Sequence, residues 1–203
     1  MTRALTADQL LFATHNAGKL EEMRELLAPR GVTVVSAKDH NLPEPVETED
    51  TFVGNARIKA HAAASATGLV ALADDSGLCI EALGGAPGVY TADWAETPEG
   101  RDFDLAMGRA HKALIDAAAP QPWRATFVSV LVLAWPDGHD EVFEGRIDGE
   151  LVWPTRGAHG HGYDPMFIPE GHTLTFAEMS HQAKNAVSHR GRALQKLLAE
   201  CFT

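Results

Sequence analysis

Short apolar runs alternate with helical periodicity in the first half of the chain. The expected strands of this half lie at residues 10–14, 32–35 and 70–73. Between the first two strands, apolar side chains recur at the spacing of one helical face, and Gly31 is expected to end that helix. A second helix is expected at residues 51–67, with Gly68 as its C-terminal stop. The acidic and proline-rich stretch at residues 42–50 is expected to form a loop.

Longer apolar runs and glycine-containing turns fill the second half. The expected strands lie at residues 124–135, 141–147 and 151–153, and the expected helices at residues 101–118 and 188–200. Residues 136–138 and Asp148-Gly149 are expected to form turns between these strands. Strands alternate with helices early and form hairpins later, which predicts an α/β fold with a mixed, twisted β-sheet flanked by helices. At 203 residues the chain is expected to form one domain, residues 1–203, in which two lobes share one core.

The charge balance limits the classes of partner. The chain carries 28 acidic and 17 basic residues, which gives a formal net charge of −11 at pH 7. This excess of negative charge argues against binding to nucleic acid or to an anionic membrane surface, because both require a broad positive field. A small anionic ligand is compatible with it if a few lysines or arginines gather in one site. The basic residues inside motifs therefore matter most.

Cysteine usage and hydropathy indicate a soluble, cytoplasmic protein. Cys79 and Cys201 are far apart and lack the spacing of metal ligands, so we expect both to be reduced. The longest apolar stretch, residues 127–135, includes Ser129 and is much too short to span a bilayer. The N-terminus lacks the long apolar core of a secretion signal.

Two adjacent carboxylates end the third apolar run. The sequence Leu72-Ala73-Asp74-Asp75-Ser76-Gly77-Leu78 places Asp74 and Asp75 where the strand is expected to stop in a tight turn. Adjacent acids repel each other, more so when burial removes solvent, and such a pair usually needs a cation. Oxygen ligands of this kind suit Mg²⁺. Taken alone, the segment is more typical of an ordinary solvated turn, because Asp, Ser and Gly are common turn residues.

The first strand-to-helix connection has the features of a phosphate site. The segment Thr14-His15-Asn16-Ala17-Gly18-Lys19 would present backbone N–H groups and a lysine at the start of a helix. It is not a Walker A loop, because the leading glycine is missing and Leu20 follows the lysine. The alternative is a capped helix with a solvated lysine.

The second helix and the loop before it offer further charges. Asn55 and Lys59 are four residues apart and therefore share one helical face. Three glutamates, at positions 44, 47 and 49, precede this helix, and one of their carboxylates could complete the coordination of a cation held by Asp75. The alternative is a set of charges on a loop and a helix surface.

Two C-terminal segments combine glycine, aromatic and basic residues. The glycines of residues 160–165 would let the backbone approach a flat ligand, and Tyr163 offers a ring that could stack on a base. In residues 184–190, Lys184 and Arg190 supply positive charge for phosphates. The alternatives are a core tyrosine and a helix cap.

Five segments in this order resemble the inosine triphosphate pyrophosphatase family, whose members hydrolyse deaminated purine nucleoside triphosphates. The segments are residues 14–19, Phe52-x-x-Asn55-Ala56-x-x-Lys59, Asp74-Asp75-Ser76-Gly77-Leu78, Gly162-Tyr163-Asp164-Pro165 and Ser188-His189-Arg190. The similarity spans roughly residues 10–198 and includes the glycine-rich loop at residues 84–88. It implies two lobes with a central nucleotide-binding cleft. It also implies hydrolysis of ITP, dITP or XTP to the nucleoside monophosphate and pyrophosphate, which removes these nucleotides from the pool.

The resemblance also implies roles for individual residues. Asp75 matches the catalytic acid and Mg²⁺ ligand, and Glu47 is our choice for the second metal ligand, with Glu44 as its competitor. The expected substrate-binding residues are Thr14, His15, Asn16, Ala17, Gly18, Lys19, Ser76, His161, Gly162, Tyr163, Asp164, Lys184, His189 and Arg190. The family usually has phenylalanine where this chain has His161, which bears on the expected base preference. The resemblance further implies a homodimer.

Three other interpretations fit parts of the pattern. One is a pyrophosphatase for other modified nucleotides. A second is a non-catalytic nucleotide-binding protein of the same fold, although such a protein would usually have lost its charged catalytic residues. A third is a zinc hydrolase built on His159 and His161, which lack a third soft ligand at a convincing spacing.

Overall fold

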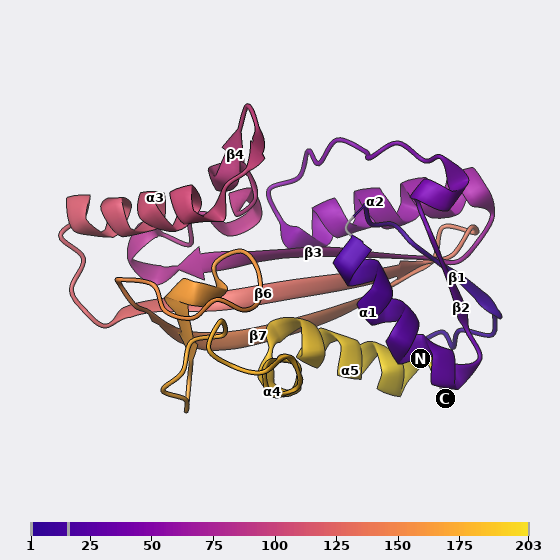
Figure 1. Ribbon diagram of the computed structural model, residues 1–203. Coiled ribbons are helices and arrows are strands. Elements are labelled where there is room, and N and C mark those ends of the chain that lie inside the picture. The colour runs from indigo at the N-terminus through magenta and orange to yellow at the C-terminus, as the bar shows by residue number, and fades with distance from the viewer. Residues whose placement is uncertain (1, 16, 203) are drawn as a thin grey trace. The chain divides into compact units, whose positions relative to one another are not determined.

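In the computed structural model, residues 2–15 and 17–202 are described, and they form a mixed six-stranded sheet with flanking helices (Figure 1). The strands of this sheet are β1 (Gln9–Phe12), β2 (Thr33–Ser36), β3 (Ala71–Ile80), β6 (Trp123–Ala134), β7 (Asp140–Leu151) and β8 (Phe167–Pro169). A separate pair consists of β4 (Glu96–Thr97) and β5 (Gly100–Arg101). The helices are α1 (Ala17–Leu27), α2 (Phe52–Thr67), α3 (Phe103–Asp116), α4 (His181–Val187) and α5 (His189–Cys201).

The order of strands in the sheet is β2-β1-β3-β6-β7-β8. β1 pairs in parallel with both β2 and β3, whereas β7 and β8 are antiparallel. The predicted α/β fold with a mixed sheet flanked by helices is therefore confirmed.

Strand β3 does not end at the paired acids. It continues through Asp74 and Asp75 to Ile80, so the prediction of a tight turn at this point is wrong. The reason lies in the tertiary structure: β1 pairs with the start of β3 at Ala71 and Leu72, β6 lies on its other side, and the later residues Leu78 and Ile80 are fully buried. Pairing in a central strand supplies the backbone hydrogen bonds that a turn would otherwise have to provide.

Strand β7 also passes through a predicted turn. The expected break at Asp148-Gly149 and the separate strand at residues 151–153 are wrong, because β7 is continuous to Leu151. Gly149 pairs with Pro169 of β8, and a Cβ atom at position 149 would lie only 2.2 Å from the carbonyl oxygen of Ile168. This glycine therefore permits close strand pairing and does not form a turn.

The chain divides into two compact units, which we describe separately. Unit 1 comprises Met1–Asp75, Val130–Glu144 and Ala193–Thr203, and unit 2 comprises Ser76–Ser129 and Gly145–Arg192. The organisation as one domain whose lobes enclose a nucleotide cleft stays a prediction.

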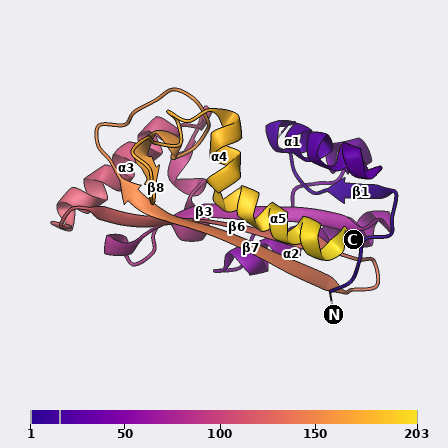
Figure 2. The same cartoon turned by 90° about the horizontal axis from the view of Figure 1, so that it is seen from below.

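In unit 1, helices cover both faces of the sheet (Figure 2). α1 and α5 lie on one face, where Leu27 and Leu197 pack in one cluster with Phe12 and Leu72. α2 lies on the other face and buries a row of alanines against the strands. Small side chains on this row let the helix approach the sheet closely.

Helix α2 begins and ends where local chemistry predicts. Thr51 is its N-cap, and the threonine side chain accepts a hydrogen bond from the Gly54 N–H at 3.1 Å. Gly68 follows the helix in the left-handed conformation, with φ 70°.

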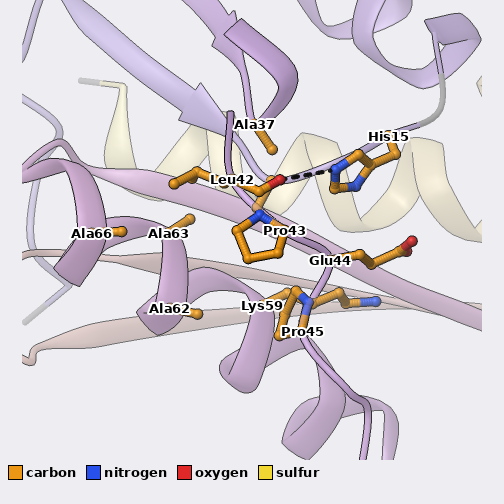
Figure 3. A pocket seen from close by; sticks show the side chains of 11 residues that line it. His15, Ala37, Leu42, Pro43, Glu44, Pro45, Lys59, Ala62, Ala63 and Ala66 are labelled. Carbon is orange, nitrogen blue, oxygen red and sulfur yellow. Dashed lines mark hydrogen bonds between the residues drawn. The ribbon is translucent and has the colours of Figure 1, made fainter. Parts of the chain in front are cut away.

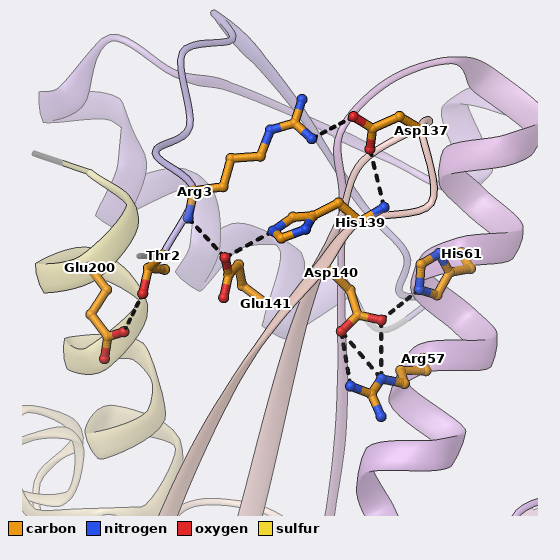
Figure 4. A network of polar contacts seen from close by, with 9 residues as sticks. All are labelled: Thr2, Arg3, Arg57, His61, Asp137, His139, Asp140, Glu141 and Glu200. Carbon is orange, nitrogen blue, oxygen red and sulfur yellow. Dashed lines mark hydrogen bonds and ion pairs between the residues drawn. The ribbon is translucent and has the colours of Figure 1, made fainter.

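Polar contacts order the N-terminal segment and the end of the β6–β7 hairpin in unit 1 (Figure 4). Arg3 pairs with Asp137 at 2.6 Å. On the hairpin, the Asp140 carboxylate lies 3.0 Å from the Arg57 guanidinium and 2.8 Å from His61 Nε2, and both partners belong to α2. The pair of Arg3 and Asp137 is solvent-exposed, so it fixes geometry more than it adds stability.

Unit 2 has its own core, rich in aromatic side chains. Phe127 meets Phe167 edge to face, with ring centroids 4.7 Å apart, and Phe176 completes the group. α3 covers one face of the strands, and its N-cap Asp102 accepts a hydrogen bond from Leu105 N–H at 3.0 Å. The short helix α4 is a further element that the hydrophobic pattern did not indicate.

Among residues 2–15 and 17–202, no helix is both long and apolar enough to cross a bilayer.

Candidate active site

The two adjacent acids of β3 point to opposite faces of the sheet. Successive side chains of a strand alternate between faces, and each acid pairs with a lysine from a different helix. Asp74 bonds Lys19 of α1, whereas Asp75 lies 3.3 Å from Lys59 of α2. The two carboxylates therefore lie on opposite faces of the sheet, and each has a lysine of its own.

Asp75 is the more constrained of the two acids. Asp75 is 9% exposed, and its Oδ2 atom has no hydrogen-bond partner among the described residues. The pKa of this carboxyl is raised to about 6, mainly by burial and also by the charges of Glu47 and Asp74, against the opposing effect of the Lys59 ammonium. The result is a buried carboxylate that is poised to accept a proton or a cation.

Lys59 links Asp75 to a second carboxylate. Its Nζ atom lies 2.7 Å from Glu47 Oε1 and 3.3 Å from Asp75 Oδ1. Burial lowers the pKa of Lys59, but the charges of Asp75, Asp74 and Glu47 more than offset this effect, so the net shift is upward. One ammonium therefore faces more negative charge than it can neutralise.

This donor set fits a magnesium ion. Two carboxylates, one with an unpartnered buried oxygen, are the usual protein contribution to an Mg²⁺ site that substrate phosphates complete. Of the two glutamates considered from sequence, Glu47 shares a lysine with Asp75, whereas Glu44 lines a neighbouring hollow. Within the described part of the chain, no three acidic, histidine or cysteine side chains form a cage of their own, so the assignment of a metal here is a proposal.

The segment predicted to bind phosphate connects β1 to α1. Thr14 is buried, and Ala17 and Gly18 open the first turn of α1. Asn16 lies outside the described residues. The ammonium of Lys19 bonds Asp74, which corrects the alternative of a solvated lysine.

A small hollow lies beside these residues in unit 1 (Figure 3). Its volume is about 150 Å³, and alanines of α2 and residues 42–45 form most of its wall. His15, Glu44 and Lys59 lie toward one side of it (Figure 3). Pockets for drug-sized ligands have volumes of about 300–1,000 Å³, so this hollow is too small to hold a nucleoside triphosphate.

The glycine-rich segment of unit 2 is organised around Asp164. The Asp164 side chain accepts a hydrogen bond from the His161 N–H at 2.8 Å and pairs with Lys184 in the buried interior. Gly160 leaves room for it, because a Cβ atom there would lie 2.1 Å from Asp164 Oδ2. Asp164 and Lys184 therefore hold this segment in shape, and any contact of theirs with substrate stays a prediction.

Tyr163 is a core residue in this structure. Only 1% of its surface is exposed, and its hydroxyl lies 3.5 Å from the carbonyl oxygen of Thr91. The alternative of a core tyrosine is thus the one observed, and the ring is not open for stacking on a base. Its hydroxyl pKa is raised by burial.

Two further residues that were predicted to bind substrate contact side chains of β6 in unit 2. Ser76 donates a hydrogen bond to the hydroxyl of buried Ser129 at 3.1 Å. His189 stacks on Phe127, with centroids 4.7 Å apart and planes 8° from parallel. Arg190 follows at the start of α5 and is half-buried.

Comparison with known proteins identifies the family. The sequence model described as the Ham1 family matches residues 10–200. The chain belongs to the Ham1 family. This confirms the family that the five segments indicated.

Curated and solved Ham1 relatives cover nearly the whole chain. The dITP/XTP pyrophosphatase of Ruegeria pomeroyi is 68% identical, over 100% of this chain and 99% of its own length. A HAM1 protein of known structure from Coxiella burnetii has a TM-score of 0.88 at 38% identity, and it covers 94% of this chain and 96% of its own. The nucleoside-triphosphatase / dITP/XTP pyrophosphatase from Mycobacterium abscessus has a TM-score of 0.76 at 40% identity, covering 94% and 98%.

Sequence reasoning missed supporting residues of this Ham1 site. Ser129 is the polar residue within the apolar run at residues 127–135, and that exception could have marked it as a partner of a functional side chain. Thr91 accepts a hydrogen bond from the Leu78 N–H at 2.9 Å, and no sequence pattern signals this contact.

The raised pKa of Asp75 predicts a specific pH dependence of stability in the metal-free Ham1 protein. The folded state holds the Asp75 proton more tightly than the unfolded state, in which the pKa is about 3.9. Its stabilising contribution is present below about pH 4 and is lost as pH rises through about 6. Asparagine has no proton to lose, so the free energy of unfolding of Asp75→Asn should rise relative to that of wild type as pH increases through this interval. The expected rise is on the order of 2–3 kcal/mol.

Denaturant unfolding in a chelator at several pH values measures this difference. The expected difference between variant and wild type grows from pH 4 to about pH 6.5 and is then constant. A constant difference over the whole range would show that Asp75 titrates normally.

Proposed function

We propose that this protein hydrolyses deaminated purine nucleoside triphosphates, ITP, dITP and XTP, to the nucleoside monophosphate and pyrophosphate. The observation that carries the proposal is the buried carboxylate of Asp75, whose pKa is raised to about 6 and which lies beside Lys59 and Glu47. Relatives that match the chain over its whole length and are named dITP/XTP pyrophosphatase support the choice of substrate.

Asp75 and Glu47 would hold Mg²⁺, which supplies charge neutralisation at phosphate oxygens when bound. Asp75 would accept or orient the proton of the attacking water, since a general base works best when its pKa is near the operating pH. Lys59 holds both carboxylates in place from α2. Lys19 forms an ion pair with Asp74, and its ammonium group would bind the substrate phosphates.

Base selection follows from hydrogen-bond chemistry. Hypoxanthine and xanthine carry a carbonyl at position 6, which accepts a hydrogen bond, whereas adenine carries an amino group there. Donors from backbone N–H groups, His189 or Arg190 would match the carbonyl and leave the amino group unpaired. An unpaired buried polar group costs about 1–3 kcal/mol, and several such mismatches would reject adenine strongly. A His161 side chain beside the base would make its surroundings more polar than phenylalanine would.

We also propose a cytoplasmic homodimer. The two cysteines, Cys79 and Cys201, are free, as expected in a reducing compartment. Trp153 is 42% exposed and offers apolar area to a second copy. Light scattering coupled to size-exclusion chromatography would test the dimer.

A substrate panel tests the proposed function. Inosine, xanthosine, adenosine, guanosine and thymidine triphosphates are incubated with the protein and Mg²⁺, and pyrophosphate and orthophosphate are counted separately. The expected result is one pyrophosphate per inosine or xanthosine monophosphate, little orthophosphate and slow turnover of the other three. Faster turnover of thymidine triphosphate would favour a pyrophosphatase for other nucleotides, and tight binding without turnover would favour a non-catalytic protein.

A further inference from the structure

An irregular segment carries Glu47 to the catalytic carboxylate. We call residues 42–49 the strap; they form neither helix nor strand between β2 and α2. At its start, the Leu42 N–H donates to the Ala37 carbonyl at 3.0 Å, and the Leu42 carbonyl lies 3.3 Å from His15 Nε2. Near its end, the Glu47 carboxylate lies 2.7 Å from Lys59. The position of this carboxylate therefore depends on how the strap is held.

Little side-chain packing supports the strap from below. The hollow of about 150 Å³ lies between residues 42–45 and the alanines of α2 (Figure 3). Val46 in the middle of the strap is 78% exposed, so its side chain adds little stability through burial. A segment with few buried contacts opens at low free energy unless polar contacts hold it. The hydrogen bonds at its two ends must therefore fix its path.

Asn55 supplies the contact at the C-terminal end. This residue of α2 is 3% exposed, and its Oδ1 atom accepts a hydrogen bond from the Glu49 N–H at 3.0 Å. Only the amide oxygen can accept from an N–H group, so the chemistry fixes the orientation of the side chain. Lys59 lies one helical turn further along the same face. Asn55 thus holds the backbone two residues after Glu47 and on the helix that carries its partner.

Gly54 gives the strap the space to reach Asn55. A Cβ atom at position 54 would lie 2.5 Å from Glu49 Cβ and 2.7 Å from Glu49 Cγ. The φ angle is helical here, so the absence of a side chain is needed for this approach and not for backbone conformation. Adding a methyl group would push the end of the strap away from α2.

We propose that Asn55, with the space left by Gly54, is the positioning residue for Glu47. It acts on the strap and does not touch substrate. Through the Glu49 N–H, it places the Glu47 carboxylate on Lys59 next to Asp75. Its relation to catalysis rests on the proposed function, whereas its relation to the strap does not.

The test compares Asn55→Ala, Asn55→Asp and Gly54→Ala with wild type. Asn55→Asp keeps an acceptor oxygen for the Glu49 N–H, whereas Asn55→Ala removes it. Ser65→Ala is the matched control, because Ser65 is exposed on the same helix. The first readout is the rate at which a glutamate-specific protease cuts after positions 47 and 49, which needs neither metal nor substrate. The second readout is the Mg²⁺ concentration that gives half of the maximal shift in melting temperature.

The expected result is faster strap cleavage in Asn55→Ala and Gly54→Ala, by about five- to tenfold, the factor that corresponds to one hydrogen bond. The half-maximal Mg²⁺ concentration should rise by a similar factor in both variants. Asn55→Asp should return to within about twofold of wild type, and Ser65→Ala should not differ from it. Recovery of the wild-type cleavage rate and Mg²⁺ response in Asn55→Asp would show that the acceptor oxygen positions the strap. A general loss of helix stability would not be reversed by the aspartate.

Unchanged strap cleavage and an unchanged Mg²⁺ response in folded Asn55→Ala would overturn the proposal. If that variant does not fold, Gly54→Ala decides, because alanine is favoured over glycine in helices and the added methyl group comes closest to Glu49 of the strap, with the Thr51 hydroxyl as its next neighbour. Absence of inosine triphosphate hydrolysis by the wild type would overturn the proposed function alone, since the cleavage rates still decide whether Asn55 holds the strap.

Discussion

Asparagine in place of Asp75 is expected to lower kcat for inosine triphosphate by a factor of about 10²–10⁴, the usual contribution of a positioned proton acceptor. The side chain keeps its shape but loses its charge and its affinity for a proton. Nucleotide binding should change much less, because the role of Asp75 is concentrated in the transition state. Steady-state kinetics, together with equilibrium binding of inosine triphosphate to the variant and of a non-hydrolysable analogue to the wild type, measures both effects.

Asp93→Asn is the control for this substitution, because it removes one exposed carboxylate of the same type elsewhere in the chain. It should leave both kcat and binding unchanged. Equal losses of binding and turnover in Asp75→Asn would contradict the assignment of Asp75 as the catalytic acid.

Methionine in place of Lys184 is expected to lower the free energy of unfolding by about 3–5 kcal/mol. The ammonium of Lys184 pairs with Asp164 in the interior of unit 2, where Asp164 is almost fully buried. Removing the lysine leaves that carboxylate with the His161 N–H but without a cation. The loss should appear in denaturant unfolding at neutral pH.

The double variant Asp164→Asn with Lys184→Met tests the cause. Removing both charges should recover most of the loss, because no unpaired buried charge then remains. Lys112→Met is the control, since Lys112 and Asp116 form an exposed pair on α3 that is worth roughly 0.3–0.5 kcal/mol. If Lys184→Met costs no more than Lys112→Met, the buried pair does not hold the glycine-rich segment.

Elements with local signals could be predicted closely from sequence. The limits of α2 follow from a threonine cap and a glycine stop, and both act through hydrogen bonds within a few residues. The strand at the paired acids could not be predicted in this way. Asp, Ser and Gly favour a turn when only neighbours in sequence are considered, and the position of β3 beside β6 in the sheet overrides that preference.

The candidate site shows the same division. Residue type and spacing identified Asp75, Lys59 and Lys19 as candidates, together with three glutamates from which the family resemblance selected Glu47. It did not indicate that Asp74 and Asp75 serve opposite faces, each with its own lysine. Nor did it indicate that Asn55 holds the strap, since that contact joins a side chain to a backbone group six residues earlier.

By itself, the sequence determined the family, the class of fold and the residue types available for chemistry, because motif order and hydrophobic period are properties of the chain alone. Only the tertiary structure decided which charges meet and which are buried. Tyr163 shows why: its ring can either stack on a ligand or pack in a core, and the surroundings that bury it come from distant segments. The raised pKa of Asp75 has the same origin, since burial and the charges of Glu47 and Lys59 act across space.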